Sequence, residues 1–472
     1  MKARRNPSLA WILALLLATP SAWRLAAEEW NPDGDTPTSG PLSDAARAVK
    51  DRPIGAGFTF SMGGSSQELF QKIDNQRRTF FQPTEDNFSW LARERVNVEI
   101  KQGTLFRTFL EVQDARLNFG AGWGTVVDSA RHRDLFLDVY QAYAELGLMP
   151  DIVDQPSLVF RVGRQELVLE GRHLFSENDW LNTGQTFDLA RAIWRPEGFQ
   201  VDAFTGWPVK FDRDNLKLPN TPENLAGVNL KALGVPFKQS IEGLLVYTWN
   251  NKDAFSGERG GMDDEKLWTL SGRAAGRFFR RWDYEAVASL QAGQSGGDEV
   301  RAWSGFANVG YTFKLDYFRT LRVAAQYSED SGDKNPHDGT SQTFDPLFGD
   351  RFIFHSKLLA IGGKNLDDLA ARLTAKVWKG GMIEMDYHFF WLNQARDALY
   401  EASGDDNRRV LTGRAGRSLA QEMDLQVTHS FNSNLSISSG LFLLEPGHYF
   451  KRTNNHSTND ASSLNFVVKT SF

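Results

Sequence analysis

Apolar and polar residues alternate along most of the chain after residue 55, in segments of about ten residues. Every second residue between Ile241 and Trp249 is apolar or glycine, and the row from Ile383 to Trp391 repeats the pattern. The complementary row of the second segment holds Glu384, Asp386 and His388. Because neighbouring side chains of a strand point to opposite faces, each segment predicts a strand with one apolar and one polar face. Such strands are typical of a wall between lipid and water.

The connections between these segments also alternate in length when they are counted back from Phe472. Eight mostly short turns fall near 102–104, 148–156, 195–198, 234–238, 280–281, 314–319, 379–380 and 431–434, between nine mostly longer loops that include 63–89, 168–186 and 330–367. The alternation predicts an all-β fold, a closed transmembrane antiparallel β-barrel of about 18 strands with short periplasmic turns and long extracellular loops. The segment from Phe352 to Ala360 would break the alternation, so we place it inside the longest loop, folded toward the pore.

The beginning of the chain predicts export. Basic residues within 2–5 precede an apolar run from Leu9 to Ala18, and small residues follow this run as they do at a cleavage site. This is the pattern of a secretory signal peptide. We expect residues 1–27 to be this peptide, cleaved after Ala27 or after Ala22. Residues 28–54, rich in Pro, Asp, Gly and Ser, predict a flexible periplasmic lead, and residues 55–472 the barrel.

The end of the chain carries a separate signal. Apolar residues alternate from Leu464 to the terminal Phe472. This final amphipathic strand resembles the assembly signal of outer-membrane barrels, so it predicts an interaction of Phe472 with the barrel assembly machinery. Closure of the sheet would pair both edges and leave no unpaired backbone group in lipid.

Composition excludes several other classes of protein. The chain has no cysteine, which rules out disulfides, thiolate metal sites and a thiol nucleophile. Its formal net charge of −6 disfavours a nucleic-acid partner. A secreted β-propeller or β-helix is the soluble alternative, but the chain lacks the repeat that those folds show.

Strand parity directs many arginines into the lumen. Where Val96, Val98 and Leu110 face lipid, the opposite row holds Arg93, Arg95 and Arg107. The same argument places Arg273, Arg277, Arg322 and Arg372 inside. A positive lining favours anions, and guanidinium groups bind carboxylates through two hydrogen bonds. Pairing with inward acids such as Asp386 and Asp424, which would stiffen the wall, is the alternative.

The stretch RVGRQELVLEGR, residues 161–172, does not fit strict alternation. Phe160 and Val162 face lipid and Arg161 the lumen, but Arg164 would then also face lipid, at a cost of roughly 2–4 kcal/mol. A β-bulge at Gly163 would reverse the parity. It would bring Arg161, Arg164 and Glu166 into the lumen and turn Leu167 and Leu169 outward.

We expect no enzyme activity and no cofactor. His429 and Ser430 are adjacent, so a regular strand holds them on opposite faces, and parity places no serine beside the inward His388. The acidic segment 329–338 lacks the spacing of a calcium loop, so no metal site is predicted.

Several motifs in order resemble the alginate export family of outer-membrane porins: GRQEL at 163–167, Asp179-Trp180, TFDLAR at 186–191, TFDPLF at 343–348, KNLDDL at 364–369, DYHFFW at 386–391 and QEMDL at 421–425. The resemblance implies an 18-stranded barrel with an arginine-rich constriction that passes a polyuronate out of the periplasm. It points to Arg164 and Arg191 as selectivity residues, and then to Arg161 and Glu166.

The expected partners follow from this assignment: an anionic polysaccharide or carboxylate substrate, outer-membrane lipid and lipopolysaccharide, and periplasmic export proteins. Two alternatives stay open, an uptake porin for small carboxylates and, more distantly, an outer-membrane hydrolase.

Overall fold

The computed structural model describes residues 49–75, 87–119, 135–148, 157–209, 223–236, 239–258, 260, 262–315, 319–358, 361–400, 406–453 and 459–472. The expected signal peptide, residues 1–27, and residues 28–48 of the expected lead lie outside the described residues. Within the described part, the lead ends in strand β1 (Arg52–Gly55), which pairs with the next strand.

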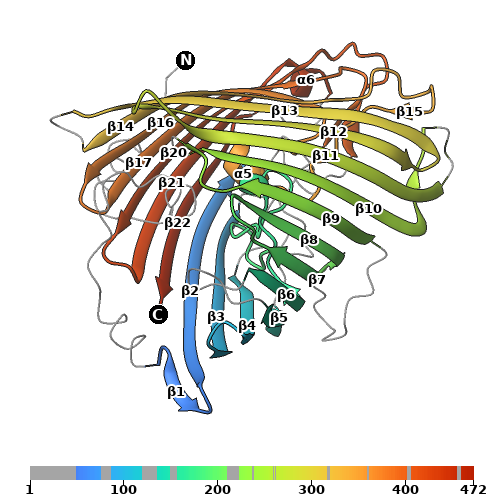
Figure 1. Ribbon diagram of the computed structural model, residues 1–472. Coiled ribbons are helices and arrows are strands. Elements are labelled where there is room, and N and C mark those ends of the chain that lie inside the picture. The colour runs from blue at the N-terminus through green and yellow to red at the C-terminus, as the bar shows by residue number, and fades with distance from the viewer. Residues whose placement is uncertain are drawn as a thin grey trace.

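Eighteen antiparallel strands form a closed barrel, as the alternation predicted (Figure 1). Each strand pairs with its neighbour along the chain, and the last pairs with the first. The strands are β2 (Phe58–Asp74), β3 (Asn87–Gln102), β4 (Phe106–Phe119), β5 (Leu135–Leu148), β6 (Leu158–Gln165), β7 (Phe187–Trp194), β8 (Phe199–Pro208), β9 (Glu223–Ala232), β10 (Ser240–Ser256), β11 (Met262–Phe278), β12 (Trp282–Ser295), β13 (Asp298–Phe313), β14 (Thr320–Asp330), β16 (Leu366–Trp378), β17 (Gly381–Leu392), β20 (Ser418–Ser430), β21 (Leu435–Pro446) and β22 (Ala461–Ser471).

The predicted turns lie between these strands, but one predicted loop is too long. The expected loop 63–89 is wrong at its start, because β2 continues to Asp74. Gly63 and Gly64 suggested a loop, yet a Cβ on Gly64 would lie 2.6 Å from the Arg95 carbonyl oxygen and 2.8 Å from the Phe472 ring. The glycine permits a close approach within the sheet and does not end the strand.

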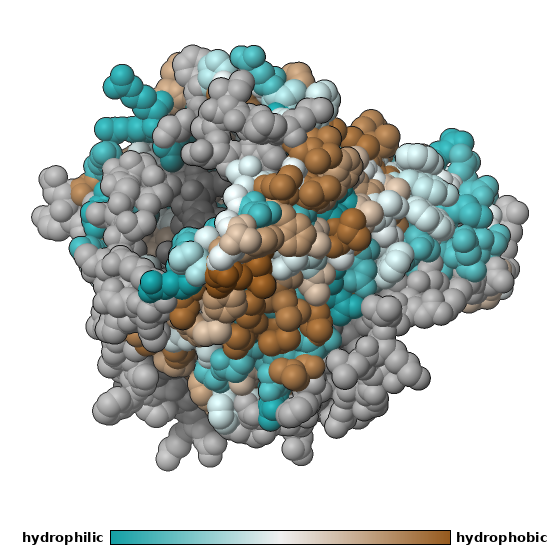
Figure 2. Space-filling model, turned by 60° about the horizontal axis from the view of Figure 1, so that its bottom comes forward, coloured by the Kyte–Doolittle hydropathy of each residue, from teal (hydrophilic) through white to brown (hydrophobic). Residues whose placement is uncertain are grey.

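The outer face of the wall is apolar. Val162, Leu270 and Leu290 are each more than half exposed. Hydrophobic residues gather over the wall in Figure 2, and hydrophilic residues flank them. None of the helices in the described residues is long and apolar enough to cross a membrane.

Two loops enter the barrel and pack against the inner face of the wall (Figure 1). The β6–β7 loop carries the 3-10 turn η1 (Glu170–Arg172), and the β14–β16 loop carries strand β15 (Thr340–Ser341) and the short helix α5 (Arg351–Phe354). Leu167, Phe175 and Phe344 from these loops contact inward residues of β7 to β13. The barrel interior therefore contains a hydrophobic core.

The described residues of the segment predicted to be excluded from the wall, 352–358, lie in this interior, and residues 359–360 lie outside the described residues. Its first residues belong to α5, where Phe352 and Phe354 are buried. The remaining loops contribute a small hairpin, β18 (Ala398–Tyr400) with β19 (Asp406–Arg409), and the helix α6 (His448–Thr453).

Candidate functional site

Three cations from the wall surround one carboxylate of the β6–β7 loop. Asp179 Oδ1 lies 2.6 Å from Arg93 Nη2 and 3.7 Å from Arg95 Nη1, and Asp179 Oδ2 lies 2.7 Å from Lys469 Nζ. Arg93 and Arg95 come from β3 and Lys469 from β22, which both flank β2. We call Arg93, Arg95 and Lys469 the cation socket. Although burial would raise the pKa of Asp179, these three cations hold it well below its usual range.

The loop is held in the socket by further contacts. Arg93 Nη1 donates to the carbonyl oxygens of Asp179 and Leu181, at 3.1 and 3.0 Å. Arg95 lies 3.5 Å above the centre of the Tyr140 ring, whose hydroxyl donates to Glu166 Oε1 at 2.8 Å. A Cβ at Gly184, which has φ +67°, would lie 2.6 Å from that hydroxyl. Glycine at 184 thus lets the loop approach the wall.

A second cluster lies near the short-turn end of β3 to β6. Arg107 Nε donates to Glu99 at 2.5 Å, and Arg161 Nε donates to Glu145 Oε1 at 2.6 Å. Arg161 also lies 4.4 Å from the centre of the Tyr143 ring. These arginines are neutralised by acids of the same wall.

Four of the remaining inward arginines also have acidic partners. Arg191 forms two hydrogen bonds with Asp202, and Arg322 forms three with Asp283. Arg273 contacts Glu242 and Glu285, and Arg372 lies 3.7 Å from Asp386, whereas Arg277 lies opposite Asp283 in the register of β11 and β12. Pairing of this kind stiffens the wall, whereas in the cation socket three cations share one loop carboxylate as their ion-pair partner.

The structure contradicts the predicted bulge at Gly163. β6 pairs with β5 and β7 in continuous register through Gly163, and an irregularity lies instead on β5, between Val139 and Gln141. Arg164 therefore continues the outward row of Phe160 and Val162. It avoids an unpaired charge there by donating to both carboxylate oxygens of Asp188 and to the Val139 carbonyl oxygen.

The predicted orientation of the following residues is wrong as well. Leu167 and Leu169 pack in the interior core, because the chain leaves the sheet after Gln165 and turns inward. Glu166 lies inside as expected, beside Tyr140.

The two inward loops are joined to each other. The Phe348 N–H donates to the Leu174 carbonyl oxygen at 3.0 Å, and the Asp350 N–H donates to the Arg172 carbonyl oxygen at 3.0 Å. Phe175 and Phe348 also form an isolated β-bridge. The loops thus form one layered plug against the wall.

Sequence reasoning missed Asp179 and Lys469 as site residues. Lys469 could have been found, because it lies on the polar row of the last strand. The position of Asp179 depends on the path of the loop, which has no periodicity.

His388 and His429, the two histidines weighed in the sequence, contact an acid and an indole. His388 Nδ1 lies 2.9 Å from Asp368, and its Nε2 has no hydrogen-bond partner among the described residues. His429 Nδ1 accepts a hydrogen bond from Trp378.

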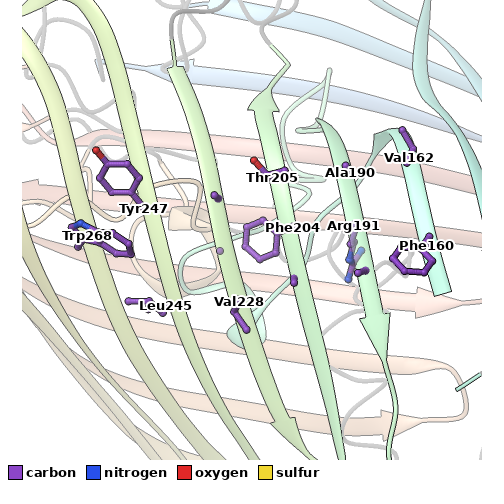
Figure 3. A pocket seen from close by; sticks show the side chains of 14 residues that line it. Phe160, Val162, Ala190, Arg191, Phe204, Thr205, Val228, Leu245, Tyr247 and Trp268 are labelled. Atoms are coloured by element: carbon purple, nitrogen blue, oxygen red, sulfur yellow. The ribbon is translucent and has the colours of Figure 1, made fainter. Parts of the chain in front are cut away.

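A depression of about 620 Å³ lies on the outer face of β6 to β11 (Figure 3). Its lining includes the small residues Ala190, Ala203 and Gly227. Phe160 and Trp268 lie at its two ends in Figure 3. It faces the membrane and not the lumen, so it lies outside the substrate path.

A closed 18-stranded barrel with an apolar outer face and a charged, loop-filled interior defines an outer-membrane porin. The chain belongs to the alginate export family, whose model matches residues 58–463. It is therefore a protein of the bacterial outer membrane.

Solved porins share the fold at low sequence identity. OpdQ of Pseudomonas aeruginosa is 12% identical, with a TM-score of 0.56 over 88% of this chain and 97% of that one. A BenF-like porin from Pseudomonas fluorescens Pf-5 is 11% identical, with a TM-score of 0.56 over 88% and 98%. OccK9 (OpdG) of P. aeruginosa is 14% identical, with a TM-score of 0.55 over 88% and 98%. The comparison with curated proteins found no match.

Proposed function

We propose that this protein is an anion-selective channel that passes an acidic, carboxylate-bearing polysaccharide of the alginate type out of the periplasm. The cation socket carries the proposal. Arg93, Arg95 and Lys469 hold the Asp179 carboxylate as they would hold a uronate carboxylate, through charge and directed hydrogen bonds. Movement of the β6–β7 loop would exchange Asp179 for the substrate.

The charge balance supports this assignment. Elsewhere on the inner wall the arginines are matched by acids of neighbouring strands, so they contribute little net field. In the cation socket the acid in direct contact with the three cations belongs to the loop, and Glu111 of the wall also lies near Arg95. Removal of the loop carboxylate would leave three wall cations for a substrate anion, and a positive lining favours anions.

Reversal potentials in planar bilayers under a salt gradient test the proposal. We expect wild type to prefer anions, and added polyuronate to block the current. Lys469→Gln, at a partly exposed position, and Arg93→Gln should each lower the anion-to-cation permeability ratio several-fold. Arg301→Gln is the control, because Arg301 is exposed and pairs with Glu299 near the strand end. Equal permeability to anions and cations in wild type would refute the proposal.

Uptake of small carboxylates is the second candidate, and the plug favours it. Two loops joined by backbone hydrogen bonds pack inside the barrel, and an obstructed interior suits a small solute better than a polymer. Permeation of vesicles by galacturonate, with exclusion of its oligomers, would favour uptake. Permeation by oligomers would favour export.

A further inference from the structure

We propose that Asp386, His388 and Asp424 form a binding site for a divalent transition-metal ion such as zinc. The three side chains come from the adjacent strands β17 and β20 and point to the inner face of the wall. Each offers one ligand atom, and these atoms lie within 4.8 Å of one another. All three residues are buried, with at most 7% of their surface exposed.

The two carboxylates are placed where they would otherwise repel each other. Asp386 and Asp424 are directly opposite in the register of β17 and β20. Like charges at such a pair destabilise a sheet. Both carboxylate oxygens of Asp424 are buried and accept no hydrogen bond from a basic or amide group of the described residues, and the polar side chain beside them, Glu422, is a further carboxyl group. A cation between the two acids would remove the repulsion and satisfy the free oxygens.

His388 is oriented as a metal ligand. Its Nδ1 lies 2.9 Å from Asp368 Oδ1, and a carboxylate there accepts the Nδ1 proton. The lone pair then resides on Nε2, which is buried and has no partner in the described part of the chain. A carboxylate behind a histidine is the usual support of a metal-bound imidazole.

One imidazole and two carboxylates as ligands favour some metal ions over others. Calcium and magnesium take oxygen ligands, whereas imidazole with carboxylates suits zinc and other first-row divalent metals. Acids exceed cations in this cluster: Asp368, Glu384, Asp386, Glu422 and Asp424 lie near Lys357 and Arg372.

The β14–β16 loop covers the site. Ser356 Oγ donates to Glu422 Oε2 at 2.6 Å, and the Leu358 N–H donates to Glu422 Oε1 at 3.1 Å. Lys357 Nζ lies 3.6 Å from Asp386 Oδ2, so the ammonium and the metal ion would share the Asp386 carboxylate. The loop shields the ion from the lumen, which predicts slow exchange.

Metal binding to the full chain in detergent, without a histidine tag, tests this site. After chelator treatment, we expect one zinc per chain by equilibrium dialysis with mass-spectrometric metal analysis. Cobalt as a probe should give the visible absorption of mixed nitrogen and oxygen ligands. Asp424→Asn and His388→Gln should each weaken binding at least ~10-fold. His337→Gln, in an exposed loop, is the matched control and should bind as wild type does.

Heat-dependent gel migration establishes that each variant is a folded barrel, and Asp386→Asn provides a second test of the carboxylate pair. Stoichiometric binding lost in the site variants and kept in His337→Gln supports the proposal. Absence of stoichiometric binding to wild type, or unchanged affinity in folded Asp424→Asn, overturns it and leaves the acids sharing a proton.

Discussion

At the scale of a single residue, Arg164 tests whether a charge on the outer face of the wall contributes to anion selectivity. Its guanidinium is paired with Asp188, and their side chains are only 11% and 14% exposed. Arg164→Gln should therefore leave the anion preference unchanged and lower the stability of the barrel by about 3 kcal/mol, because the Asp188 carboxylate loses its charge partner in a place shielded from water. Reversal potentials and urea denaturation in detergent measure the two effects.

Asp188→Asn is the matched partner variant and should cause a similar loss of stability. A shift in reversal potential for Arg164→Gln as large as that for Lys469→Gln would show that Arg164 belongs to the substrate path.

Glu170 makes the docking of the β6–β7 loop depend on pH. Burial, with the nearby Glu242 carboxylate, raises the pKa of Glu170 from 4.5 to about 7. Glu170 therefore binds its proton more tightly when the loop is docked than when it is undocked. Docking is strongest below the undocked pKa of 4.5 and weakens as pH rises to about 7, by on the order of 3 kcal/mol in all.

Single-channel conductance should therefore increase between about pH 5 and pH 8, as the plug loosens. Glu170→Gln, which stays neutral, should keep the low conductance across this range. A wild-type conductance that falls as pH rises would contradict this assignment.

At the scale of elements, the strands were predictable, and so was the inward position of the segment that begins at Phe352, whereas the inward path of the β6–β7 loop was not. A strand exposes one face to lipid, so alternation alone placed Arg93 inside and Val96 outside. Nothing local requires a loop to enter the barrel. Leu167 and Leu169 have the opposite parity to Phe160 and Val162. The chain leaves the sheet after Gln165, and Phe344 and Phe175 bury both leucines in the interior.

In the candidate site, too, the residues on strands could be predicted and the residue on a loop could not. Parity placed Arg93 and Arg95 on the inner face, but the acid that they bind, Asp179, lies 84 or more positions away on a loop. Pairing across such a distance depends on tertiary packing. The predicted bulge at Gly163 would have turned the Arg164 charge away from lipid by a local change of the strand. In the structure the charge stays on the outer row and is paired with Asp188 of the next strand.

Gly349 tests whether the two inward loops act as one plug. A Cβ at this position would lie 2.1 Å from the His173 carbonyl oxygen. Gly349→Ala should separate the loops at a cost of about 1–3 kcal/mol, raise single-channel conductance and leave the wall intact. Conductance and limited proteolysis of the loops measure the effect.

Gly243→Ala is the control, because a Cβ at Gly243 meets no described atom within 4 Å. Unchanged conductance in Gly349→Ala would show that the loops do not limit the current.

At the scale of the whole molecule, closure depends on one seam that joins the two ends of the barrel. Ten residues of β2, Ser65 to Asp74, pair with β22. The Phe472 N–H donates to the Gly64 carbonyl oxygen at 3.0 Å, and its carbonyl oxygen accepts from Gly64 at 3.2 Å. Without this seam two strand edges would face lipid, where unpaired backbone groups are costly.

Phe472→Ala distinguishes two roles of the Phe472 side chain, recognition during barrel assembly and stabilisation of the folded barrel. The backbone hydrogen bonds of the seam do not require the ring, which is 41% exposed, so the barrel refolded in detergent should lose no more than about 1 kcal/mol. If the ring is read by the assembly machinery, the amount of folded barrel in cells should fall several-fold. Heat-dependent gel migration and denaturation measure the two quantities.

Phe313→Ala is the matched control, because Phe313 ends β13 beside a short turn and is 38% exposed. It removes a similar aromatic contact with lipid at a position that the assembly signal does not include. Equal loss of folded barrel in both variants would assign the effect to lipid contact. A loss confined to Phe472→Ala would assign it to assembly, since the seam itself is retained in both proteins.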